Sequence, residues 1–146
     1  MKKLLFLLLF CGTLFASQPF TLENLDNLRI YFVNKAPFLD KELEQRIKDK
    51  VTSKLQERGI HMNSVDASTL MLKIEAIKLH TNYVVNTQLA IAEEVITKRK
   101  EDVQTFAYTY HLNDFFDTKE PRIDTMESFE FLLEEFLDLY KEDNEN

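Results

Sequence analysis

Histidines are the first candidates for chemistry, because a neutral imidazole can bind a metal ion or accept a proton near neutral pH. The chain has three, at His61, His80 and His111. None of them has a second histidine, a cysteine or a carboxylate at metal-ligand spacing, so we expect no metal site. We predict surface or hydrogen-bonded structural roles for all three. A hydrolase would require His80 or His111 to meet a carboxylate in a cleft.

The adjacent carboxylates Glu93 and Glu94 fall within a predicted strand. Alternation along a strand places one of them on each face, with Glu93 on the face of Leu89 and Ile91. A buried Glu93 with a raised pKa could act as a general acid. We favour the interpretation in which the strand has left the core by Glu93 and the carboxylate is solvated.

Motifs that would support catalysis or cofactor binding do not occur in the sequence. There is no G-x-S-x-G, no H-E-x-x-H and no glycine-rich phosphate loop. The chain has two glycines, at Gly12 and Gly59, which is too few for a phosphate cradle. We therefore predict no catalytic residues, no cofactor and no enzymatic activity.

Apolar residues that the fold would leave uncovered are stronger candidates for a functional role. Phe115 and Phe116 are adjacent aromatics in a predicted loop, where they either close one end of the core or contact a partner. Met71 and Val84 lie on the more polar face of the predicted sheet. These four residues are the possible partner contacts. The basic cluster at residues 98–100 is more simply explained as a solvated hairpin tip.

Most of these side chains lie in residues 69–112, which we interpret as three consecutive strands. Apolar and polar residues alternate there with the period of half-buried strands. The short polar connections between the strands predict antiparallel neighbours. The predicted strands cover residues 70–79, 83–96 and 103–112.

The alternation predicts two further details of these strands. It slips near Ala76 and Ile77, where a bulge would keep Ile77 and Leu79 on the apolar face. In the third strand one side is expected to carry all the large side chains, namely Phe106, Tyr108, Tyr110 and Leu112.

The flanking elements complete the expected fold. Residues 28–33 form a short apolar strand, followed by a helix that begins after an N-cap at Asp40 and ends at Gly59. A second amphipathic helix begins at Asp124 or Thr125. The order β-α-β-β-β-α predicts an α+β fold, a two-layer sandwich in which two helices cover one face of a four-stranded, mostly antiparallel sheet. The other sheet face would be open.

The first 16 residues have the features of a secretory signal peptide. Lys2 and Lys3 precede a short apolar run, and Ala16 offers a small residue before the cut. The run is too short to span a bilayer, and no second one follows, so we expect no transmembrane span in the mature chain. Lipid anchoring at Cys11 is a weaker alternative, because bulky Phe10 precedes the cysteine.

Composition supports one folded domain over residues 17–146 in the periplasm. Hydrophobic residues make up 45% of the chain, which is enough for a packed core. Loss of the two signal-peptide lysines changes the formal net charge from −7 to −9. An acidic protein is poorly suited to nucleic acid, whose binding depends on neutralising phosphates. The sequence leaves the oligomeric state open.

The order of these segments resembles that of the LptE-like periplasmic proteins, which are small α/β sandwiches. The resemblance is one of pattern and covers most of the predicted mature chain. It implies assistance to lipopolysaccharide transport at the outer membrane and a β-barrel partner. The matching segments are residues 28–33, 43–60, 70–79, 83–96 and 103–116.

Three functions are compatible with these features. The first is a non-enzymatic periplasmic accessory protein that binds a protein of the cell envelope. The second is a carrier of a small lipid or hydrophobic ligand, with a pocket between sheet and helices. The third is the hydrolase described above. The residues expected to line the carrier pocket are Phe106, Tyr108, Phe129 and Phe136.

Overall fold

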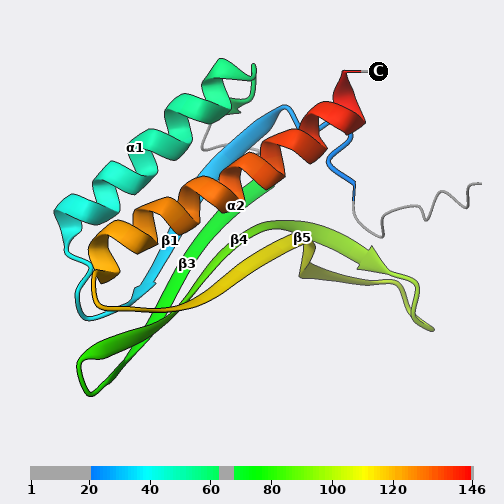
Figure 1. The fold of residues 1–146 in the computed structure, drawn as a ribbon. Helices are drawn as coiled ribbons and strands as arrows, with labels where there is room; N and C mark the ends of the chain where they lie inside the picture. The colour runs from blue at the N-terminus through cyan, green and yellow to red at the C-terminus, as the bar shows by residue number, and fades with distance from the viewer. Residues whose placement is uncertain (1–20, 63–67, 146) are drawn as a thin grey trace, which may run out of the picture.

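The computed structural model describes residues 21–62 and 68–145. The predicted signal peptide and Cys11 lie outside the described residues. The fold is α+β, with two helices and one mixed sheet of five strands (Figure 1). In chain order the elements are β1 (Asn27–Lys35), α1 (Lys41–Glu57), β2 (His61–Met62), β3 (Ser68–Leu79), β4 (Asn82–Thr97), β5 (Val103–Thr118) and α2 (Pro121–Asn144).

The strands lie in the order β2-β1-β3-β4-β5. β1 pairs in parallel with β3, from Leu28 opposite Ser68 to Lys35 opposite Glu75, as expected when a helix connects two strands. β3, β4 and β5 form an antiparallel meander. The four-strand prediction missed β2, which falls where a polar loop was expected. A strand of two residues is too short for alternation to appear in its sequence. In the structure it lies beside β1, and His61 N–H donates a hydrogen bond to the Asp26 carbonyl at 2.8 Å.

Helix α1 forms as its sequence predicts. The Asp40 carboxylate accepts a hydrogen bond from Leu43 N–H at 2.9 Å and so caps the first turn. The buried residues recur every four positions and form one stripe. At the other end Gly59 takes a φ of 79°, which a side chain would strain. The buried residues of α1 are Leu43, Ile47, Val51 and Leu55.

Helix α2 is longer at both ends than predicted. It begins at Pro121, whose ring fits the first turn, and Asp124 receives a hydrogen bond from Thr118 instead of capping the helix. It continues to Asn144, where a frayed tail was expected. Asp143 accepts a hydrogen bond from Leu22 N–H at 2.6 Å, and Asn144 donates to the Leu22 carbonyl at 2.9 Å. The chain that leads into β1 therefore holds the last turn of α2 in place.

Both helices lie on one face of the sheet, which we call the helix side (Figure 1). The core lies between them and the inward residues of the strands. Two aromatic contacts connect the layers. The rings of Tyr110 and Phe136 meet edge to face with centroids 5.6 Å apart, and those of Phe32 and Phe129 lie 5.8 Å apart.

A bulge in β5 changes which side chains share a face. Ile91 pairs with Tyr110 and Ala92 pairs with Tyr108, so Thr109 is the extra residue. Because side chains alternate with a period of two, one extra residue exchanges the two faces of the strand. Tyr110 therefore points to the helix side, whereas Phe106 and Tyr108 point away from it and are exposed. The prediction that all the large residues of this strand share a side is wrong.

The bulge predicted near Ala76 does not form. Residues 69–79 of β3 pair with β4 in unbroken register. Strict alternation then places Ile77 and Leu79 on the face away from the helices, where both are exposed. The apolar character of these two residues suggested a continuing core face, but they lie at the far end of the β3–β4 hairpin.

Candidate interaction surface

The sheet face opposite the helices, which we call the open face, carries a concentration of exposed apolar side chains. The described residues include eleven large hydrophobic side chains that are exposed. Strand alternation places eight of them on the open face. Apolar exposure of this kind is informative only when it is contiguous. The eight are Tyr31, Ile77, Leu79, Val84, Ile96, Phe106, Tyr108 and Phe115.

The first hollow of the open face is aromatic. Tyr108 lies over Met71, with its hydroxyl 3.3 Å from the methionine sulfur. Its ring also stacks on the ring of His111, with the two centroids 6.1 Å apart. This cover explains why Met71, a predicted contact residue, is only 8% exposed although no helix lies above it. A partner would meet the tyrosine ring and not the methionine. The hollow measures about 340 Å³, and its lining includes Tyr31, Met71, Ala92, Phe106 and Tyr108.

The second hollow lies toward the other end of the sheet and measures about 460 Å³. Phe115, which is 65% exposed, and the predicted contact residue Val84 line it together with Ile77. Phe115 and Phe116 lie in β5 and not in a loop, so alternation sends them to opposite faces. Phe116 packs against the core, which leaves Phe115 as the residue of this pair that a partner can reach.

A polar band borders the second hollow, whose lining includes Lys35 and Glu75. Glu75 accepts a hydrogen bond from Lys73 at 2.8 Å and another from Lys35 at 3.1 Å. These bonds, first the one from Lys73, hold the pKa of the Glu75 carboxyl below its ordinary value. The open face therefore carries a charged network at neutral pH between Met71 and Ile77 of β3, and this network forms one side of the second hollow.

The outer edge of the sheet is β5, which pairs only with β4 within the described residues. Its side chains include the carboxylates of Asp114 and Asp117 but no lysine or arginine. On the helix side, the carboxylate of Glu135 in α2 contributes a further negative charge, and this charge disfavours ionisation of Tyr110. Burial, and then this charge, raise the pKa of the Tyr110 hydroxyl to about 12. The edge is thus long and acidic.

The predicted chemical candidates lie apart from one another. His61 lies on β2, His80 in the β3–β4 turn with a φ of 55°, and His111 on the open face. Glu93 accepts hydrogen bonds from Ser68 at 2.5 Å and from Thr109 at 2.6 Å. In the part of the chain that the structure describes, no three histidine, cysteine or acidic side chains are placed to hold a metal ion.

The residues expected to line a carrier pocket do not meet. Phe129 and Phe136 are buried in the core, whereas Phe106 is 64% and Tyr108 is 54% exposed on the open face. The bulge at Thr109 is the reason for this separation. These four side chains therefore form no common lining.

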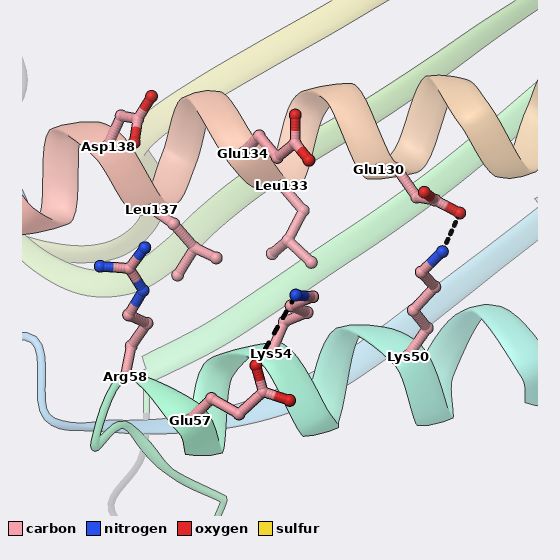
Figure 2. Close-up of a pocket in the computed structure, with 9 residues that line it drawn as sticks. All are labelled: Lys50, Lys54, Glu57, Arg58, Glu130, Leu133, Glu134, Leu137 and Asp138. Atoms are coloured by element: carbon pink, nitrogen blue, oxygen red, sulfur yellow. Dashed lines mark hydrogen bonds and ion pairs between the residues drawn. The ribbon is translucent and has the colours of Figure 1, made fainter.

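The cleft between the helices is of a different kind (Figure 2). It measures about 340 Å³, and Lys50 bridges it to Glu130, while Lys54 pairs along its own helix with Glu57. Ligand pockets are mostly apolar with a few placed polar groups, whereas this lining is mostly charged and of both signs. We interpret the cleft as a solvated seam. Its residues are Lys50, Lys54, Glu57, Arg58, Glu130, Leu133, Glu134, Leu137 and Asp138.

Sequence reasoning missed several exposed residues of the open face, among them Tyr31, Ile77, Phe106 and Tyr108. Strict alternation from Met71 could have identified Ile77. Phe106 and Tyr108 had no such signal, because the residue that bulges, Thr109, is an ordinary strand residue.

Among the described residues, no helix has both the length and the apolar composition needed to cross a membrane. No protein-family model matches the sequence, and no curated protein is significantly similar to it.

Proposed function

We propose that this protein is a non-enzymatic accessory protein of the bacterial cell envelope, located in the periplasm, which acts by binding another envelope protein through its open face. The observation that carries the proposal is the gathering of exposed apolar side chains on the one sheet face without a helix. Small soluble domains rarely leave contiguous apolar surface uncovered unless something binds there.

The periplasmic location rests on the predicted signal peptide of residues 1–16. The resemblance to LptE-like proteins adds a candidate class of partner, an outer-membrane β-barrel. We do not advance the carrier function, because two of its four expected lining residues face away from the core.

The test is a cross-linking pull-down of the tagged protein from intact envelopes, followed by mass spectrometry. Phe115→Ser removes an aromatic side chain from the open face, whereas the matched control Phe131→Ser removes an exposed one from α2. We expect the same partner with the unaltered protein and with the control, and a loss of that partner with Phe115→Ser.

Melting temperatures of the variants verify that both still fold. Recovery of the partner in equal yield with Phe115→Ser and with Phe131→Ser would contradict the assignment of the open face. Recovery of the protein without any partner would contradict the proposed function itself.

A further inference from the structure

We propose that the edge of β5 takes up an extended segment of the partner as a sixth strand, and that this segment alternates apolar residues with lysine or arginine. The inference rests on the proposed function and names the chemistry of the partner. Addition of a strand to a sheet edge is a recurring mode of peptide recognition, in which the backbone supplies affinity and alternate side chains supply specificity.

The first argument is that part of this edge lacks the usual protection against pairing. Proteins protect long edges with proline, lysine, short strands, bulges or a covering element, and the bulge of β5 lies at Thr109, outside residues 110–118. β5 has 16 residues and contains no proline, lysine or arginine. The opposite edge consists of the two-residue β2 and of residues 29–35 of β1, which β2 does not pair with and which include Arg29 and Lys35. Among the described residues, β5 is therefore the long edge that no basic side chain protects.

The second argument locates the site on this edge. The bulge at Thr109 interrupts the strand, but residues 110–118 pair with β4 without irregularity. That stretch is long enough for a strand of ordinary length, about 5–6 residues. We therefore assign the added strand to residues 110–118.

The third argument gives the charge of the segment. Asp114 and Asp117 belong to this stretch, Asp124 accepts from its last residue, Thr118, and Glu135 acts on Tyr110. The first cation after the strand, Lys119, is followed by Glu120 and does not reverse this balance. Basic side chains opposite these carboxylates would add attraction and speed the encounter.

The fourth argument gives the alternation. One face of an added strand continues the open face, where it would lie beside Phe115 and the second hollow. The other face continues the helix side, where Asp114 and Glu135 lie. On the open face the edge carries Phe115 and, near its end, Asp117, whereas Asp114 and Glu135 make the helix side acidic. Apolar residues therefore suit most of the first face and basic residues the second, so the two types alternate.

The same charges argue against two other occupants. A second copy pairing through β5 would place the Asp114 and Asp117 of one chain near those of the other, and opposed like charges destabilise a strand pair. An anionic lipid surface would meet the same repulsion.

The experiment uses three synthetic seven-residue peptides and protein purified as the cell makes it. The first peptide alternates lysine and valine. The second has glutamate in place of lysine, and the third is the lysine peptide with backbone N-methyl groups at alternate residues, which removes its strand hydrogen bonds. Binding is measured by fluorescence anisotropy, and the site by hydrogen exchange of the backbone amides.

We expect the lysine peptide to bind and to slow the exchange of amides within residues 110–118. The glutamate and N-methylated peptides should not bind. Glu135→Gln, on the helix side, should weaken binding about two- to five-fold, the range for an exposed ion pair. The matched control Glu101→Gln, at the exposed tip of the β4–β5 hairpin, should leave it unchanged.

Two results would overturn the inference: no binding of the lysine peptide at millimolar concentration, or equal binding of its N-methylated form. The proposed function would still stand if the pull-down lost its partner with Phe115→Ser. Conversely, peptide binding at β5 with no partner in the pull-down would support the edge site and reject the envelope function.

Discussion

Replacement of Thr125 by valine should stabilise this protein, although most substitutions of fully buried residues do the opposite. Thr125 lies near the start of α2 with none of its surface exposed, and its hydroxyl has no hydrogen-bond partner among the described residues. Leaving a buried polar group without a partner costs about 1–3 kcal/mol. Valine has the same shape and nearly the same helix propensity, so it removes this cost without leaving a cavity. We expect a gain of about 1–2 kcal/mol.

Thr87 on β4 provides the matched control. Its hydroxyl is also fully buried, but it lies 2.5 Å from the hydroxyl of Ser128, which donates to Asp114 at 2.7 Å. Because Ser128 gives its proton to Asp114, the proton between Thr87 and Ser128 belongs to Thr87. Thr87→Val therefore leaves an acceptor on Ser128 unsatisfied and should cost about 1–2 kcal/mol. The same chemical change thus has opposite signs at the two sites.

Urea unfolding followed by circular dichroism measures both effects. The midpoint should rise for Thr125→Val and fall for Thr87→Val with an unchanged slope, which shows that the unfolded state is unaltered. For a chain of this size the melting temperature should shift by about 3–6 °C per kcal/mol. A loss of stability on Thr125→Val would refute the reasoning, since it would show that the hydroxyl is bonded, for example to a buried water.

Three further predictions concern single side chains. The pKa of the Tyr110 hydroxyl is raised to about 12 in the folded protein, so the unfolded chain loses this proton at a lower pH than the folded chain does. The free energy of unfolding should therefore fall as the pH rises above about 10. Tyr110→Phe should remove this fall, and it should also remove the last step of the tyrosine titration followed at 295 nm. Hydrogen bonds from Arg122, and then from Leu43 N–H, hold the pKa of the Asp40 carboxyl below its ordinary value of 3.8. Asp40→Asn should therefore lower the melting temperature at pH 7. The difference in melting temperature between the two proteins should disappear as the pH falls below 3.8 and through the lowered pKa of the folded state. Phe116→Ser should cost about 2–4 kcal/mol in urea unfolding, because Phe116 packs on the core, whereas Phe115→Ser should stay within about 0.5 kcal/mol.

Features governed by local sequence were predictable, and α1 is the best example. Its N-cap, its four-residue apolar spacing and its terminal Gly59 are all local signals, and each has the predicted role. The α+β fold followed from the order of the elements, and β1 and β3 pair in parallel, as a helical connection between two strands favours. By contrast, β2 and the start of α2 depend on partners distant in sequence or on a single turn. Neither feature has a repeating pattern of apolar residues in its own sequence, and both were therefore missed.

The candidate site was predictable only in part. Val84 was correctly placed on the face that the helices leave open, whereas Phe115 was predicted in a loop and lies on that face as a residue of β5. Met71 is on that face but covered by Tyr108, and Phe116 is on the other. Both differences arise from side-chain packing and strand phase, which the composition of a short segment does not determine.

The bulge at Thr109 relates the fold to the proposed contact. Without it, alternation would carry Phe106 and Tyr108 onto the helix side together with Tyr110. The bulge instead turns two large aromatic side chains to the face that no helix covers (Figure 1). Within the chain, the bulge lets Tyr108 cover Met71 and lets Thr109 donate a hydrogen bond to Glu93 at 2.6 Å, but it leaves Phe106 and Tyr108 more than half exposed. A partner that covered these two rings would bury the apolar surface that remains exposed.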